Sequence, residues 1–201
     1  MARSPAIETD TTTRLVLNLR SVGLTDDQFL RLCSDNSDFQ FEMTARGELI
    51  IMPPVSGETG WRESKINQRL ANWAEQDGAG LAFGSSSGFV LPNGAIRAPD
   101  AAWIPKHRWM KLPKEDHEKF PHICPDFVIE LRSPSDRLSE ARRKMEEYID
   151  NGARLGWLLD PNANRAYIYW PGQPAERIEN PKIISGDPVL PGFKFNFTEI
   201  V

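Results

Sequence analysis

The chain has 201 residues, of which 40% are hydrophobic and 26% charged, and a formal net charge of −4 at pH 7. This length and apolar content suffice for one substantial hydrophobic core. The negative balance excludes a protein whose whole surface attracts nucleic acid, so any contact with phosphates must come from a local basic patch.

The order of predicted elements begins with a flexible N-terminal arm over residues 1–20, followed by a single domain over residues 21–201. The sequence Thr-Asp-Asp-Gln at residues 25–28 has the spacing of a capping box, which predicts a short helix through about residue 33. Apolar residues then alternate with polar ones on both sides of Arg46-Gly47, which predicts a hairpin over residues 39–52.

The rest of the chain alternates helices with short strands. Ile66, Leu70 and Trp73 recur at helical spacing, which predicts a helix over about residues 60–76. A second long helix is expected from about residue 137 to residue 150, with Asp136 as its N-cap. The other predicted elements are strands at 81–83, 88–91, 155–159 and 166–170 and a polar, irregular segment at 105–121. This order predicts an α/β fold in which helices pack against a mixed sheet.

Two segments combine the character of a buried strand with acidic residues: Ala-Pro-Asp-Ala-Ala-Trp-Ile at 98–104 and Asp-Phe-Val-Ile-Glu-Leu-Arg at 126–132. An ionised carboxylate buried in an apolar strand is costly unless a cation or hydrogen bonds meet it. Strand alternation puts Glu130 and Arg132 on one face of the second segment. If the two strands are neighbours, Asp100 and Glu130 can chelate one Mg²⁺ or Mn²⁺, since these hard ions prefer oxygen ligands.

Pro99-Asp100, followed after 29 residues by Glu130-Leu131-Arg132, resembles the PD-(D/E)XK signature of the restriction-endonuclease-like nucleases. The surrounding sequence, over roughly residues 25–195, is similar to a bacterial branch of endonucleases in which many members are domains of unknown function. The segments that carry this similarity are 97–103, 125–136, 144–145 and 156–161. The resemblance implies a restriction-endonuclease-like core, a mixed β-sheet flanked by helices, with an N-terminal hairpin and helix.

The resemblance also implies that Asp100 and Glu130 bind the metal ion and that the backbone carbonyl of Leu131 completes the ligand set. The third signature position holds Arg132 instead of lysine, and arginine can clamp phosphate but cannot readily act as a base.

In some related nucleases the lysine lies on the following helix instead. On that predicted helix Lys144 lies at one edge of an apolar stripe, which is made up of Leu138, Ala141, Met145, Tyr148 and Ile149. Arg142 occupies the opposite edge, so the helical pattern does not choose between them. Similar nucleases often carry a further acid on the first core helix, for which Glu63 is the best match.

Structural roles remain open for each of these residues. Asp100 could cap a turn, Glu130 and Arg132 could form an ordinary ion pair, and Lys144 and Glu63 could be solvated side chains.

Function is therefore expected to be Mg²⁺- or Mn²⁺-dependent endonucleolytic hydrolysis of DNA, with homodimerisation possible. The alternative is a catalytically weak or inactive nuclease-fold module that binds nucleic acid or protein, which Arg132 and the acidic net charge both favour. Glycoside hydrolysis by a carboxylate pair is a third possibility, but the sequence lacks signs of the aromatic cleft that it would need.

The polar segment from Met1 to Arg14 has no signal-peptide core, no stretch reaches the ~18 apolar residues of a membrane helix, and Cys33 and Cys124 have no CxxC spacing. We therefore expect a cytoplasmic protein that does not associate with membranes.

Overall fold

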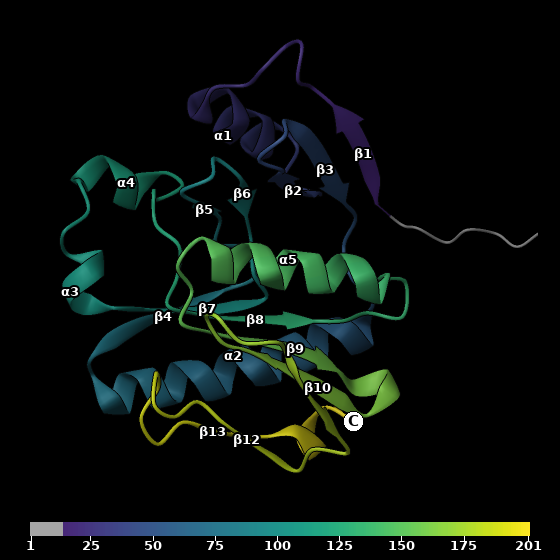
Figure 1. The fold of residues 1–201 in the computed structure, drawn as a ribbon. Coiled ribbons are helices and arrows are strands. Elements are labelled where there is room, and N and C mark those ends of the chain that lie inside the picture. Colours follow the sequence, from purple (N-terminus) through teal and green to yellow (C-terminus); the bar gives the residue numbers. More distant parts are fainter. Residues whose placement is uncertain (1–13) are drawn as a thin grey trace, which may run out of the picture.

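A computed structural model describes residues 14–201 (Figure 1). The first of its sheets is antiparallel and has the strand order β1-β3-β2-β6-β5. Its strands are β1 (Leu15–Asn18), β2 (Gln40–Met43), β3 (Glu48–Met52), β5 (Phe89–Val90) and β6 (Ile96–Arg97). The predicted hairpin is therefore confirmed as β2 and β3. Residues 1–13 of the predicted arm lie outside the described residues. Strand β1, which the arm was expected to include, pairs with β3 and belongs to the sheet.

Helix α1 (Asp26–Asp35) packs on this sheet through Phe29, which is buried together with apolar side chains of β2, β3, β5 and β6. The predicted capping box is present. The Gln28 backbone N–H donates to Thr25 Oγ1 at 3.2 Å, and the Thr25 backbone N–H donates to Gln28 Oε1 at 2.9 Å. These two bonds satisfy N–H groups that the first turn would otherwise leave unpaired.

The second sheet is mixed and has the order β11-β10-β9-β8-β7-β4, in which only β8 and β9 pair in parallel. Its strands are β4 (Gly80–Gly84), β7 (Ala101–Pro105), β8 (Phe127–Leu131), β9 (Leu155–Asp160), β10 (Arg165–Tyr169) and β11 (Glu176–Glu179), with the short helix η1 (Pro161–Ala163) between β9 and β10. The two acidic segments of the sequence supply the central neighbours β7 and β8.

Two long helices cover opposite faces of the second sheet (Figure 1). Helix α5 (Leu138–Asp150) is the crossover that joins the parallel strands β8 and β9, and α2 (Gly57–Asp77) lies on the other face. Alternate residues of β8 therefore enter different cores. Ile129 packs on the α2 side with Ile66, and Val128 packs on the α5 side with Met145.

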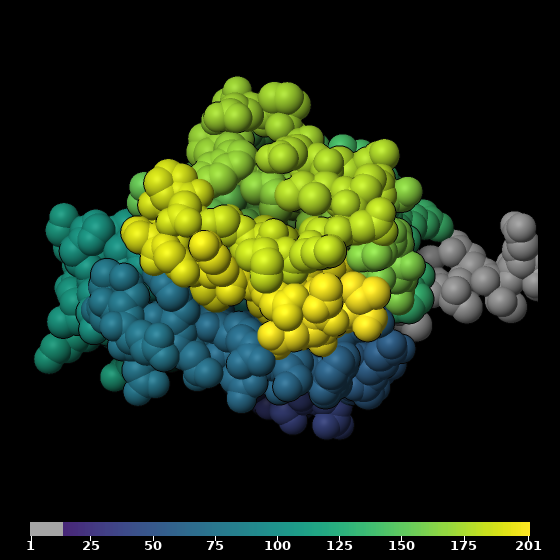
Figure 2. All heavy atoms as spheres, turned by 90° about the horizontal axis from the view of Figure 1, so that it is seen from below, coloured from purple at the N-terminus to yellow at the C-terminus, as the bar shows by residue number. Residues whose placement is uncertain are grey.

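The C-terminal residues pack beside α2 on the same face of the second sheet, where the ring of Phe193 stacks on Trp157 of β9 at 5.5 Å. Two short strands, β12 (Ile183–Ser185) and β13 (Lys194–Asn196), and the helix η2 (Phe197–Glu199) make up this segment. Figure 2 shows it in yellow against α2 in blue. Arg69 of α2 forms a 2.8 Å ion pair with Glu199, and the rings of Trp73 and Phe193 lie 5.4 Å apart.

Two local predictions were wrong. Asp136 does not cap α5, because its carboxylate accepts the backbone N–H and the hydroxyl of Ser133 and closes a turn before the helix. The segment predicted to be irregular contains the short helices α3 (Lys106–Trp109) and α4 (Lys114–Glu118). Helices of one turn are too short to show an apolar period, and these two are held by Trp109, whose ring stacks on His117 at 4.5 Å.

Candidate active site

The two acids of the sequence motif lie side by side in the second sheet. Ala101 of β7 is opposite Ile129 of β8, so Asp100 is opposite Glu130 one position further along. The Leu131 backbone N–H donates to Asp100 Oδ2 at 2.6 Å. Because the N–H and C=O of a strand residue point to the same side, the Leu131 carbonyl also faces the strand that carries Asp100.

Helix α5 supplies two side chains to Glu130. Lys144 and Tyr148 are four residues apart and share the helix face that packs on the sheet. Lys144 Nζ lies 2.8 Å from Glu130 Oε1, and the buried Tyr148 hydroxyl donates to the same oxygen at 3.1 Å. Lys144 thus reaches the acid pair from the helix that follows β8.

The other two candidate cations are engaged elsewhere. Arg132 Nη1 forms a 2.8 Å ion pair with Asp160 Oδ2, and its Nε donates to the Asp136 carbonyl at 3.1 Å. The Arg142 guanidinium lies 5.3 Å from the centre of the Tyr167 ring. Within residues 14–201, the cation that contacts Glu130 is therefore Lys144.

Helix α2 approaches the acid pair from the opposite face through Asn67 and Glu63. Asn67 Nδ2 donates to the backbone carbonyl of Asp100 at 2.9 Å and fixes the segment before β7. Glu63 is partly buried, and burial together with the negative charge of Glu130 raises its pKa. The acid predicted on the first core helix therefore lies close enough to act on this pair electrostatically.

Negative charge is crowded at the site. Burial raises the pKa of Asp100 to about 7, and the charge of Glu63 adds to this shift. Burial also raises the pKa of Glu130, with a further contribution from Asp100, although Lys144 opposes it. The carboxyl groups thus disfavour ionisation in the absence of additional positive charge.

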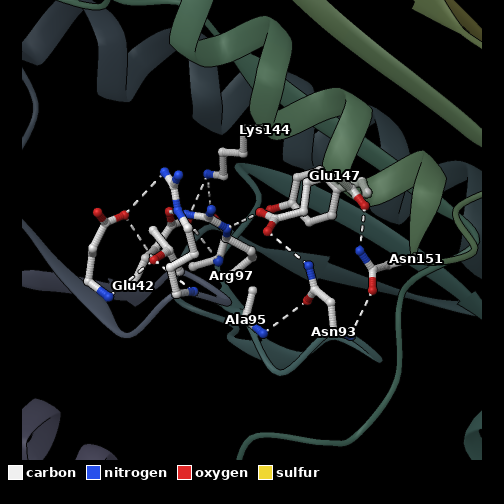
Figure 3. Close-up of polar contacts among 12 residues, drawn as sticks. Glu42, Asn93, Ala95, Arg97, Lys144, Glu147 and Asn151 are labelled. Atoms are coloured by element: carbon white, nitrogen blue, oxygen red, sulfur yellow. Dashed lines mark hydrogen bonds and ion pairs between the residues drawn. The ribbon is translucent and has the colours of Figure 1, made fainter. Parts of the chain in front are cut away.

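A second acid on Lys144 was not predicted from the sequence (Figure 3). Glu42 of β2 is only 2% exposed, and its Oε1 lies 2.7 Å from Lys144 Nζ. Its Oε2 lies 2.9 Å from Arg97 Nη1, and Arg97 Nε lies 2.6 Å from Glu147 Oε2. Burial opposes ionisation of Glu42, but Lys144 and Arg97 outweigh it and hold its pKa below the ordinary value.

The oxygen donors at the site suit a hard divalent cation. In the part of the chain that the structure describes, no group of three or more His, Cys, Asp or Glu side chains could hold a metal ion by itself. Mg²⁺, however, commonly uses one or two carboxylates and completes its shell with water and substrate phosphate. Asp100 and Glu130, whose pKa values are raised by burial and by neighbouring carboxylates, meet that requirement.

Comparison with known proteins assigns the chain to a family. The family description "Uma2: Putative restriction endonuclease" matches residues 26–198. The chain belongs to the Uma2 family. A search of curated proteins gives no match.

A crystal structure of a putative nuclease belonging to DUF820, from Anabaena variabilis, is similar to this Uma2 protein with a TM-score of 0.73. The two chains share 20% sequence identity, and the similarity covers 89% of this chain and 97% of the other. At this identity the likeness shows the fold, and it confirms the predicted mixed sheet with flanking helices. Over residues 14–201, the Uma2 protein contains no helix with the length and apolar character needed to cross a bilayer.

Removing Arg132 should affect the stability of this Uma2 protein more than its chemistry. Asp160 is 1% exposed, so Arg132→Met leaves a buried carboxylate without its cation, and we expect a loss of about 3 kcal/mol in the free energy of unfolding. Cleavage by the folded fraction should be nearly unchanged. Urea denaturation and a nuclease assay measure the two effects. The exposed Arg31→Met variant, on α1, is the control, with an expected change within about 0.5 kcal/mol. A stable Arg132→Met protein that no longer cleaves would show that Arg132 acts on substrate.

Proposed function

We propose that this Uma2 protein is an endonuclease that hydrolyses phosphodiester bonds in DNA with Mg²⁺ or Mn²⁺ as cofactor. The observation that carries the proposal is the placement of Asp100, Glu130 and Lys144 at one point of the second sheet, with Lys144 Nζ 2.8 Å from Glu130. The membership in a family described as putative restriction endonucleases supports the reaction class.

Asp100, Glu130 and the carbonyl of Leu131 would hold the cation, and Glu63 would lie on the α2 side of the same site. When bound, a divalent ion supplies Lewis-acid stabilisation of the phosphate and lowers the pKa of water. Glu130 and Glu42 raise the pKa of Lys144 although burial opposes the shift, so its side chain remains an ammonium. The ammonium can donate charge-assisted hydrogen bonds to a phosphate oxygen.

The protein as a whole is acidic, so any attraction to DNA must come from a local group of basic side chains. Such a group supports DNA as the substrate. Helix α5 and the residue before it carry exposed arginines on the element that also delivers Lys144. Such side chains contact phosphates without reading sequence and orient the nucleic acid at the site. These arginines are Arg137, Arg142 and Arg143.

Plasmid cleavage tests the proposal directly. The wild-type protein should convert supercoiled DNA to nicked or linear forms with Mg²⁺ or Mn²⁺ and not with EDTA. Glu130→Gln should lower the rate by more than about 100-fold, because a contribution of several kcal/mol to the transition state corresponds to at least that factor. Glu146→Gln, at an exposed position of the same helix as Lys144, is the matched control and should retain activity. Equal rates for wild type and Glu130→Gln would overturn the proposal.

A non-catalytic module that binds nucleic acid is the second candidate. It is favoured by the Lys144 ammonium, which already neutralises Glu130, and by Arg132, which stands at the usual lysine position but pairs with Asp160. This candidate predicts a gel shift with DNA that Glu130→Gln leaves unchanged, and no cleavage with any divalent ion. The plasmid assay and the gel shift together separate the two functions.

A further inference from the structure

Lys144 is shared between two carboxylates that the fold keeps away from water. Its Nζ lies 2.8 Å from Glu130 Oε1 and 2.7 Å from Glu42 Oε1. Glu130 is 9% exposed and Glu42 is 2% exposed, and the two acids come from different sheets. No described hydrogen bond joins Glu42 to Asp100 or Glu130; its direct contacts toward the site are the Lys144 ammonium and the Ala98 backbone N–H.

A divalent cation that binds Glu130 must compete with the Lys144 ammonium for the same carboxylate. If Glu130 were its sole partner, the displaced ammonium would remain largely buried and unpaired, which is strongly unfavourable. Glu42 offers a second carboxylate at 2.7 Å, so the ammonium can stay paired without moving away from the site.

We propose that Glu42 is a positioning residue that holds Lys144 beside Asp100 and Glu130 while a divalent cation occupies the acid pair. The inference rests on the proposed function, because it assumes that the pair binds a cation. It adds a residue from the first sheet to a site that otherwise belongs to the second.

Glu42 is itself fixed and cannot follow Lys144 toward Glu130 (Figure 3). Its Oε1 accepts the Ala98 backbone N–H at 3.0 Å, and its Oε2 pairs with Arg97 at 2.9 Å. Glu147 holds Arg97 from the other side at 2.6 Å and also accepts a 3.0 Å hydrogen bond from Asn93. Arg97 and Ala98 come shortly before Asp100 in the chain. The contacts of Glu42 with these two residues therefore also fix the distance between Glu42 and Asp100.

The effect of Glu42 on cation binding can be measured without DNA. We expect Glu42→Gln to weaken Mn²⁺ binding by about 10–100-fold in calorimetry, the range typical of residues that support metal ligands. Its kcat for DNA should fall by a similar factor while the KM for DNA stays close to that of the wild type. Glu147→Gln is the matched control, since it removes one negative charge from the same chain of ion pairs but leaves Lys144 on Glu42; its Mn²⁺ affinity should change less than about threefold.

A double variant separates positioning of Lys144 from a general structural role. In Glu42→Gln with Lys144→Met, no ammonium needs a partner, so Mn²⁺ affinity should return to near the wild-type value while cleavage stays low. This variant also removes both members of a buried ion pair, which keeps the test usable if Glu42→Gln alone does not fold. Wild-type Mn²⁺ affinity in Glu42→Gln, or no recovery in the double variant, would overturn the role of Glu42. Absence of Mn²⁺ binding in the wild type would overturn the proposed function as well.

Discussion

Asp100→Asn is expected to abolish DNA cleavage and, at the same time, to stabilise the metal-free protein above pH 7. Asparagine can still accept the Leu131 N–H bond, so the backbone between β7 and β8 should be kept. It removes one of the two carboxylates that would hold the cation, and a loss of several kcal/mol of transition-state stabilisation lowers the rate by more than about 100-fold. Plasmid cleavage with Mn²⁺ measures the loss.

The gain in stability follows from the raised pKa of Asp100. Burial and Glu63 move this pKa from the ordinary 3.8 to about 7. Between these two values the folded state binds a proton that the unfolded state has lost, so stability falls as the pH rises through the window and the full penalty is present above pH 7. Asparagine has no charge to bury, and we expect a gain of about 4 kcal/mol at pH 8, or roughly 8–16 °C in Tm.

Thermal unfolding in EDTA at pH 5 and pH 8 checks this prediction. The difference in Tm between Asp100→Asn and the wild type should be larger at pH 8. Asp150→Asn, at an exposed position at the end of α5, serves as the control and should behave as the wild type at both values. A Tm difference that is independent of pH, or undiminished cleavage by Asp100→Asn, would contradict the electrostatic account of the site.

Lys144→Met should change stability in the opposite direction. Methionine has a similar length, but it leaves the buried carboxylates of Glu42 and Glu130 without their shared cation. Breaking a buried ion pair from one side costs about 3–5 kcal/mol, which urea denaturation at pH 8 would detect. Cleavage should fall by about 100-fold or more, because a fixed positive group at the phosphate is lost.

Lys144→Arg provides the matched comparison, since it retains the charge and should recover most of the stability. A Lys144→Met protein with wild-type stability and cleavage would show that the ion pairs are dispensable. Lys144→Met and Asp100→Asn are therefore both expected to be inactive, and opposite changes in stability distinguish them.

The pair of acids could be predicted from the sequence because each acid lies in a recognisable strand segment and the two together resemble a known signature. Strand alternation and a familiar signature were enough to place Asp100 and Glu130 near each other, and the antiparallel pairing of β7 and β8 brings them together. The choice of Lys144 over Arg132 and Arg142 could not be made in the same way. This choice depends on the rotation of α5 about its axis, which decides the side chains that face β8. It also depends on Asp160 at the end of β9, which forms an ion pair with Arg132.

Glu42 illustrates what the sequence conceals. It lies between Phe41 and Met43 in a strand whose alternation suggests one apolar and one polar face, and a polar residue there is expected to face water. The structure buries it instead, because Arg97 and Lys144 approach it from other elements. A local sequence pattern cannot predict the ion pair between Glu42 and Lys144, because about half of the chain separates the two residues.

The ion pair between Glu42 and Lys144 limits how the first sheet can be replaced by another. The first sheet can be regarded as an accessory added to a nuclease core, yet it supplies a carboxylate that the site of the second sheet contacts directly. A chimera that joins a foreign hairpin to residues from α2 onward would need an acid at the position of Glu42 to keep Lys144 paired with both sheets.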